Sequence, residues 1–316
     1  MNHESPRTAP AFLMAILAVA ITLGGLLVGY EPVSGDPDRM YRPIKSELAR
    51  ALRAGQLPFW SDRFGLGTPL VAESHVAAFY PLNILLYRSL EVSPAYRLAM
   101  WLHYVALAAA TYAYARTLGI LPWGSALAAV SFTFCGFQAI HASHEPFYHA
   151  LVYLPLALLA TERFMAGGSP GWLAVLALAW GAQLTVGHFQ IQAWTAALVL
   201  FTGFWRKLEK RASWWRGLGL AGALAWGAAI AIVQLAQSAE MAMHVPSNRR
   251  ALSQIASFGY PPQHWAELVA PLLFHDLKGG PEGAYWMSIG TTNYEACFYV
   301  GTITLVLALV GLAASR

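Results

Sequence analysis

The chain has little charge and almost no cysteine. Only 11% of its 316 residues are charged, 57% are hydrophobic, and its mean hydropathy is +0.46. A soluble domain carries about a quarter charged residues, so this composition excludes an ordinary soluble domain and favours a polytopic membrane protein. The two cysteines, Cys135 and Cys297, lie in or beside apolar runs. That excludes a disulfide framework and a cysteine-rich metal site.

Nucleotide-binding signatures are also missing. The sequence contains no P-loop, nucleophile elbow, kinase motif set or solenoid repeat. Its one dinucleotide-like pattern, Gly217-Leu-Gly219-Leu-Ala-Gly222, follows no predicted strand and opens an apolar run, where small residues let helices pack closely. The net charge of +4 sits largely in short loops beside apolar runs, where it sets topology. Nucleotide-driven transport and nucleic-acid partners therefore have no support.

Apolar stretches dominate what is present. They cover residues 11–30, 95–115, 121–140, 147–161, 172–204, 217–236 and 297–314. The fifth is too long for one crossing and is interrupted by Gly187-His188-Phe189-Gln190, so we expect two short helices there. We predict an all-α, polytopic transmembrane bundle of about eight spans, with residues 1–316 as a single transmembrane domain. The first stretch is expected to be an uncleaved helix, because no small-x-small cleavage site follows it.

Two long polar segments, residues 31–95 and 237–296, separate these stretches. Within the first, Ile44, Leu48 and Leu52 recur at helical spacing between a proline at 43 and a glycine at 55. Lys45, Glu47, Arg50 and Arg53 take the other faces. The pattern predicts an amphipathic helix lying flat on the bilayer surface. Residues 79–86 predict a second short element at the interface.

The distribution of basic residues indicates the topology. Arg7, Arg116, Arg163, the basic cluster at 206–216 and Arg316 fall on one side of the predicted bundle. The positive-inside rule makes that side cytoplasmic, together with the N-terminus. Both long loops, and most of the carboxylates, then face out.

A pair of carboxylates follows the first apolar stretch directly. Asp36 and Asp38 flank Pro37, which restricts Asp36 to extended conformations. A carboxylate at the hydrocarbon boundary is partly desolvated, which raises its basicity and suits it to act as a general base. The simpler interpretation of Asp-Pro-Asp is a turn with a helix cap.

Basic residues of the same loop suit phosphate binding. Arginine binds phosphate through two parallel hydrogen bonds, although lipid headgroups are the commoner partner of such residues. The candidates are Arg39, Arg42, Lys45, Arg63, Arg88 and Arg97.

Three further motifs place imidazoles, carboxylates and amides on the predicted outer side. They are Glu73-Ser-His75, His141-x-x-His144-Glu145-x-x-x-His149 and Gly187-His188-x-Gln190. Hydrogen bonding to sugar hydroxyls or phosphate is one interpretation, and plain interfacial solvation is the other. A divalent metal site is conceivable, but the spacing matches no specific signature, so no cofactor is predicted. His103, inside the second stretch, is expected to be a hydrogen-bonded core residue.

Several stretches, taken together, resemble the YfhO family of bacterial membrane proteins, which is related to the GT-C glycosyltransferases. They are Ser34-Gly-Asp36-Pro, residues 55–60 and 64–70, Phe79-Tyr-Pro-Leu-Asn83, Phe132-x-Phe-x-Gly136-Phe, Leu154 to Arg163, Gly187-His188-x-Gln190 and Tyr299-Val-Gly301. Members of this family are usually longer, so the chain resembles a truncated member or a fragment.

The resemblance implies a GT-C-like transferase in the bacterial inner membrane, with its active face outside the cytoplasm. The donor would be a polyprenyl-phosphate sugar, and the acceptor an envelope glycan or protein. Asp36 takes the role of the general base, with Asp38 in reserve, while Arg39 and Arg42 are candidates for the phosphate. The residues expected to contact substrate are Glu73, His75, His144, Glu145, His188 and Gln190. The alternative is a non-catalytic component of envelope polysaccharide assembly or a lipid-linked sugar flippase.

Overall fold

The computed structural model describes residues 8–30, 36–64, 66–209, 213–244, 262–270 and 299–314. All regular elements in these ranges are helices, and the only β-type pairing there is an isolated antiparallel bridge between Ser61 and Thr68. The all-α prediction is confirmed in this respect. Contacts divide the chain into two compact units, Met1–Ala129 with Ser143–Val245, and Val130–Ala142 with Pro246–Arg316.

The first unit holds most of the helices. In chain order they are α1 (Thr8–Thr22), η1 (Gly24–Val28), η2 (Pro37–Tyr41), α2 (Arg42–Arg53), η3 (Ser74–Val76), α3 (Pro81–Ser89), α4 (Val92–Thr117), most of α5 (Pro122–Thr133), α7 (Glu145–Leu151), α8 (Tyr153–Met165), α9 (Gly171–Val186), α10 (Phe189–Leu208), α11 (Trp214–Ile230) and α12 (Ile232–His244). The second unit contains the end of α5, α6 (Gly136–Ile140), most of η4 (His141–Ser143), η5 (Pro262–Leu268) and α15 (Thr302–Ala314).

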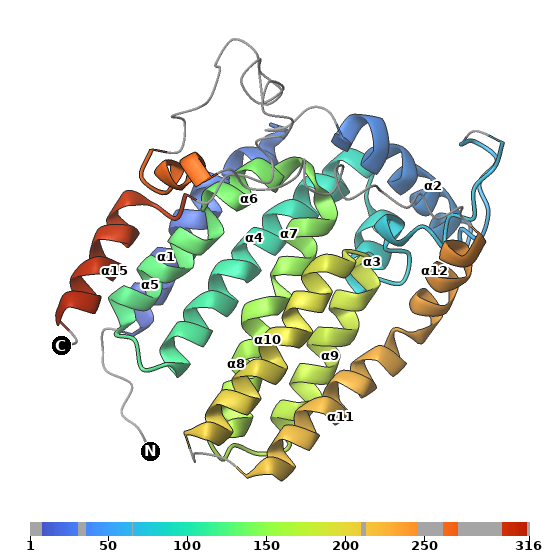
Figure 1. Ribbon diagram of the computed structural model, residues 1–316. Coiled ribbons are helices and arrows are strands. Elements are labelled where there is room, and N and C mark those ends of the chain that lie inside the picture. Colours follow the sequence, from blue (N-terminus) through green and yellow to red (C-terminus); the bar gives the residue numbers. More distant parts are fainter. Residues whose placement is uncertain are drawn as a thin grey trace. The chain divides into compact units, whose positions relative to one another are not determined.

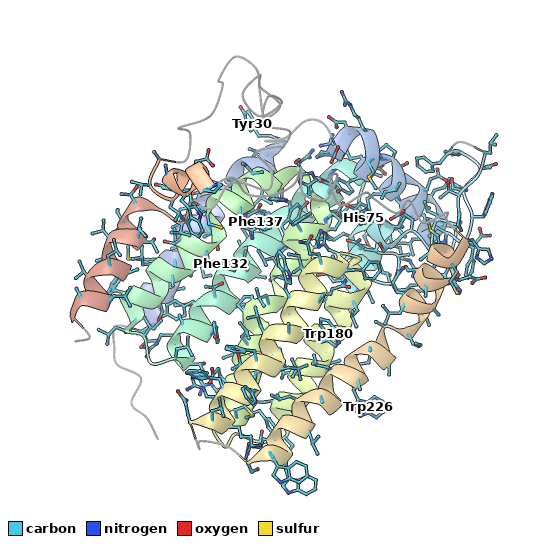
Figure 2. All side chains as sticks on the ribbon, viewed as in Figure 1. Tyr30, His75, Phe132, Phe137, Trp180 and Trp226 are labelled. Carbon is cyan, nitrogen blue, oxygen red and sulfur yellow. The ribbon has the colours of Figure 1, made fainter. Side chains whose placement is uncertain are left out.

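The centre of the first unit is a bundle in which α8 packs against α4, α9 and α10, and α11 packs against α9 (Figure 1). Its core mixes large side chains with many alanines, such as Phe164, Leu176 and Ala160. Helices α9 and α11 approach closely, because a Cβ on Gly227 would lie 2.7 Å from the Ala177 carbonyl oxygen. Trp226 instead projects from α11 away from the bundle and is 70% exposed (Figure 2). The pattern is typical of helices that meet through small residues and present large apolar ones to lipid.

The amphipathic helix predicted over 43–55 is present as α2, which lies across one end of the bundle (Figure 1). Its predicted faces are partly wrong. Lys45 is fully buried and Glu47 is 3% exposed, so neither faces solvent or headgroups. Lys45 shares a helical face with Leu48, Ala49 and Leu52, and that face packs into the core beneath the first loop. We call this end of the bundle, where α2, η3, the start of α7 and the start of α10 meet, the loop end.

The predicted break inside residues 172–204 is confirmed. Helix α9 ends at Gly187, which has a φ of +89°, and α10 begins at Phe189. The predicted span over 147–161 is instead two helices, because α7 stops at Leu151 and α8 starts at Tyr153. Pro155 explains this break, since it lacks the N–H that would donate to the Leu151 carbonyl and its ring crowds that group.

Several helices are shorter than the apolar stretches that predicted them, although α4 is longer than the stretch 95–115. Among the described residues, one helical segment, Pro122–Ser143, is by itself long and apolar enough to cross a membrane. Helices α11 and α12 would together form a second, bent by 73° where they join. Helix α1 ends at Thr22, just before a pair of glycines, and the chain continues as the 3-10 helix η1. Of the predicted last span, the structure describes α15, and the second long loop lies largely outside the described residues.

The contact between α9 and α11 predicts opposite effects for two glycines of one helix. In Gly227→Ala, the new methyl would meet Trp180 Cδ1 at 2.5 Å and the Ala177 carbonyl, so we expect a loss of about 1–3 kcal/mol. In Gly222→Ala, no atom lies within 4 Å of the new methyl, and higher helix propensity should add up to about 1 kcal/mol. Thermal unfolding in detergent measures both. Equal midpoints for the two variants would contradict the close packing.

Candidate functional site

A buried ion pair holds the loop end together. The ammonium of Lys45 on α2 lies 2.9 Å from Oε1 of Glu145, the first residue of α7. The same ammonium donates hydrogen bonds to the carbonyl oxygens of Val76 at 2.9 Å and His75 at 3.2 Å. The ammonium therefore lies within 3.2 Å of three oxygens from two other segments. The exposed fractions of the Lys45 and Glu145 side chains are both 1%.

Burial controls the protonation of this pair. Desolvation lowers the pKa of Lys45 and raises the pKa of Glu145, while the charge of each partner opposes these shifts. Glu145 Oε2 has no hydrogen-bond partner among the described residues. The pair is therefore costly to expose or to separate, and it fastens the first loop to α7.

Below Glu145, two stacked imidazoles continue the polar interior. His149 Nδ1 lies 3.5 Å from Glu145 Oε1, and the rings of His149 and His103 stack with centroids 3.7 Å apart. His103 Nδ1 donates to the Ala99 carbonyl oxygen at 2.6 Å, so in the neutral ring Nε2 accepts from the Tyr80 hydroxyl at 2.7 Å. The prediction that His103 is a hydrogen-bonded core residue is confirmed.

The predicted catalytic carboxylates lie at the surface of the loop end. Asp36 Oδ2 is 3.3 Å from Nε2 of His144, and Asp38 Oδ1 is 2.7 Å from Nη1 of Arg42. The Asp36 and Asp38 side chains are 51% and 53% exposed. Asp36 precedes η2 with helical backbone angles, φ −58° and ψ −36°, so the extended conformation predicted for it is wrong.

The predicted phosphate ligands divide between exposed and buried positions. Arg39 is exposed on η2, and the Arg42 guanidinium lies over the Tyr96 ring, 5.5 Å from its centroid. Lys45 was also a candidate phosphate ligand. That prediction is wrong, because the Lys45 ammonium is enclosed with the Glu145 carboxylate.

In the motif Glu73-Ser-His75, Glu73 caps the short helix η3, and Ser74 contacts the break between α9 and α10. The Glu73 side chain accepts a hydrogen bond from the backbone N–H of His75, and the ring of His75 lies among the side chains at the loop end (Figure 2). Burial lowers the pKa of His75, although the nearby Glu73 carboxylate opposes the shift. Ser74 Oγ donates to the Gly187 carbonyl oxygen at 3.1 Å. A side chain at position 187 would collide with the Ser74 backbone, so the glycine permits this approach.

His188 and Gln190 of the third predicted motif lie at the start of α10. His188 caps the helix by accepting from the Ile191 N–H, and its ring packs on Phe147, which also contacts the His144 ring. Gln190 is exposed on the first turn. The structure therefore brings together Asp36, His144 and Glu145 with the η3 and Gly187 segments. It places Gln190 and Arg39 at the exposed edge of the same region.

Sequence reasoning missed the interior of this site. Lys45, His149 and Tyr80 make its contacts, and the sequence patterns that contain them did not predict that these residues meet in a buried cluster. One available signal was the spacing of Lys45 from Leu48 and Leu52, which puts a lysine on a buried helical face. Another was Glu145 and His149, four residues apart on one helix.

No cluster of three or more His, Cys, Asp or Glu residues suited to hold a metal occurs in the described ranges. The dinucleotide-like pattern at 217–222 lies wholly within α11, and a Cβ on Gly219 would touch Phe164 and Leu173. Gly219 therefore serves helix packing, whereas Gly217 and Gly222 have open space at the Cβ position.

Comparison with known families settles the relationship. The family model described as "Bacterial membrane protein YfhO" matches residues 10–180, just over half of the chain. The chain belongs to the YfhO family. No match was found among curated proteins or among solved structures. The matched region contains the Lys45–Glu145 pair and the Asp36–His144 contact, so both lie in the part of the chain that defines this YfhO-family membrane protein.

The ion pair predicts a rescue in a double variant. Lys45→Met leaves the Glu145 carboxylate buried without its counter-ion, which should cost about 3–5 kcal/mol of stability. Replacing both charges, in Lys45→Met with Glu145→Gln, should recover most of that loss. The midpoint of thermal unfolding in detergent measures it.

Arg53→Met is the control, because it removes an exposed pair with Glu91 and an exposed hydrogen bond to the Leu90 carbonyl oxygen, and should change stability by about 1 kcal/mol or less. If the single and double variants at positions 45 and 145 unfold alike, the buried pair does not hold the loop end together.

Proposed function

We propose that this YfhO-family protein is a GT-C-type membrane glycosyltransferase. In this proposal it crosses the bacterial inner membrane about eight times, with its N-terminus in the cytoplasm and its loop end outside. It transfers a sugar from a polyprenyl-phosphate carrier to an envelope glycan or protein. The observation that carries the proposal is the contact between Asp36 and His144, a solvent-accessible carboxylate and an imidazole 3.3 Å apart at the end of an apolar bundle.

The reaction follows from the chemistry of that carboxylate. Asp36 accepts the proton of the acceptor hydroxyl as the hydroxyl oxygen attacks the anomeric carbon. The bond from that carbon to the phosphate oxygen breaks, its electron pair stays on the phosphate, and configuration inverts. Arg39 and Arg42, on η2 and at the start of α2, provide positive charge for the leaving polyprenyl phosphate.

The remaining surface groups of the loop end suit sugar hydroxyls. Glu73 and His75 are part-exposed on η3, and His188 and Gln190 lie on the adjoining turn of α10. Carboxylate, imidazole and amide groups at one rim can each donate to or accept from a sugar. Glu145 differs from these residues, because its carboxylate is enclosed with Lys45 and cannot contact a sugar directly. Its role is to hold the preceding residue, His144, in place at the rim. No cofactor is needed for this step.

A lipid-linked sugar flippase is the second candidate. The buried charges of Lys45 and Glu145, next to the paired imidazoles of His103 and His149, favour it, since ionisable groups inside a membrane bundle often mark a transport path. A mass spectrum of the lipids bound to the purified protein, incubated with acceptor, separates the two. If the bound polyprenyl phosphate has lost its sugar, the protein is a transferase. If the lipid-linked sugar remains intact, the protein is a transporter.

The base assignment predicts the effect of removing one charge. Asp36→Asn should lower sugar transfer by about 10²-fold or more, because the amide cannot accept the proton, while expression and membrane insertion persist. Transfer from a radiolabelled polyprenyl-phosphate sugar measures it. Asp62→Asn, an exposed carboxylate of the same loop, is the control. Undiminished transfer in Asp36→Asn would refute the assignment, and loss in Asp38→Asn alone would move the base to Asp38.

The His144 contact predicts a pH dependence. When the imidazole is protonated it holds the Asp36 carboxylate in an ion pair and weakens it as a base, so transfer should fall as pH drops through the range where histidine titrates. Glutamine cannot take up this proton, so His144→Gln should shift the fall to lower pH. The pH profile of kcat/KM measures the shift, and an unchanged acid limb would contradict the pairing.

A further inference from the structure

A rigid loop of aromatic residues projects from the loop end. We call residues 57–64 with 66–68 the aromatic loop. Its two arms are joined by two backbone hydrogen bonds, from Ser61 N–H to the Thr68 carbonyl oxygen at 2.9 Å and from Thr68 N–H to the Ser61 carbonyl oxygen at 2.8 Å. Gly67 has a φ of +108° and lies beneath the Trp60 indole, where a side chain would collide with the ring. The loop is therefore a defined turn.

Glu47 fastens the base of the aromatic loop to α2. Ser61 Oγ donates to Glu47 Oε2 at 3.1 Å, and Arg63 Nη1 lies 3.3 Å from Glu47 Oε1. Arg50 also pairs with Glu47 at 2.8 Å. Burial alone would raise the pKa of Glu47, but hydrogen bonds from Arg50 and Ser61 hold it below its usual value. The carboxylate therefore stays charged at neutral pH and keeps the loop in place.

The tip of this fixed loop is apolar and uncovered. Phe59 and Trp60 are 61% and 60% exposed, and Leu66 is fully exposed. The chain returns to the core immediately afterwards, since Leu70 and Val71 are 1% exposed. Burying a side chain of this size is worth about 1.5–3 kcal/mol, so a rigid loop that holds three of them outward is suited to an apolar surrounding.

Helix α12 indicates the depth at which the loop lies. It is joined to the chain just after the aromatic loop, because Gln234 donates to the Val71 carbonyl oxygen and Ser238 donates to the Ala72 carbonyl oxygen. A cavity of about 360 Å³ between the two segments is lined by Pro69, Ala72, Gln237, Glu240, Met241 and His244.

Along α12, ionisable side chains occur only in the second half, although Met243 there is 77% exposed. Ile232 and Val233 at its start are more than half exposed, whereas Glu240 and His244 near its end are polar. Such a change is expected where a helix of a membrane protein passes from hydrocarbon to headgroups. Pro69, which directly follows the aromatic loop, lines the cavity together with Glu240 and His244.

We propose that the aromatic loop inserts into the interfacial layer of the bilayer. Trp60 and Phe59 would lie among the headgroups, and Leu66 would reach the upper acyl chains, as expected of tryptophan and apolar residues at a membrane boundary. Arg63 and Arg50, 64% and 53% exposed beside the tip, are placed to contact lipid phosphates. The partner is the lipid surface, and the proposal is independent of the sugar-transfer activity.

Site-directed fluorescence quenching tests this directly. The full chain with Cys135→Ala and Cys297→Ala carries one new cysteine, Leu66→Cys, labelled with an environment-sensitive nitrobenzoxadiazole dye. It is reconstituted into vesicles of phosphatidylcholine and phosphatidylglycerol, with or without lipids spin-labelled near the headgroup. Gln56→Cys, exposed at the end of α2, is the matched control. We expect roughly threefold stronger quenching at position 66 than at position 56.

Each other outcome would overturn the proposal. Equal and weak quenching at both positions, with emission typical of water, would place the tip in solvent. Blue-shifted emission without lipid quenching would mean that protein covers the tip. Disulfide formation between unlabelled Leu66→Cys copies in dilute vesicles would identify a second copy as the partner. Circular dichroism of each variant confirms that the helices persist.

Discussion

The loop end depends on one buried cation. Lys45 directs its ammonium at two backbone carbonyls and at the carboxylate of Glu145, so a single side chain joins α2, the η3 segment and the start of α7. A lone charge in this place would cost several kcal/mol, and this penalty makes the arrangement specific. The positions of neighbouring surface residues follow from it.

The buried ion pair also fixes the position of a surface residue, His144. It precedes Glu145 directly, so the ion pair fixes its backbone, and its ring then lies between Asp36 and Phe147. On the opposite side of Lys45, the carbonyls of His75 and Val76 fix η3, whose Ser74 contacts Gly187 at the start of α10. A buried ion pair and its backbone contacts thus support an exposed rim of carboxylate, imidazole and arginine groups. Rigid support of this kind is what a reactive rim requires.

Glu47 has the same role for the aromatic loop. It is nearly buried, and it binds Ser61 and two arginines, so that an apolar tip stays outside the core. The helix α2 therefore uses two charged residues, both predicted to face outward, as internal fasteners for two parts of the first loop. This explains why an amphipathic pattern misjudged them: a charged residue on a helix is counted as solvated unless its partner, far away in sequence, is known.

The sequence by itself determined the helical class, the amphipathic α2 and the break at Gly187. Hydrophobic periodicity and glycine conformation are local properties, so they could be read without coordinates. It also pointed to Asp36 and His144, but as separate candidates. Their contact, the pairing of Lys45 with Glu145 and the stacking of His103 on His149 join residues far apart in the chain. Only the tertiary structure decided them, because close packing and the desolvation of charge depend on which distant segments meet.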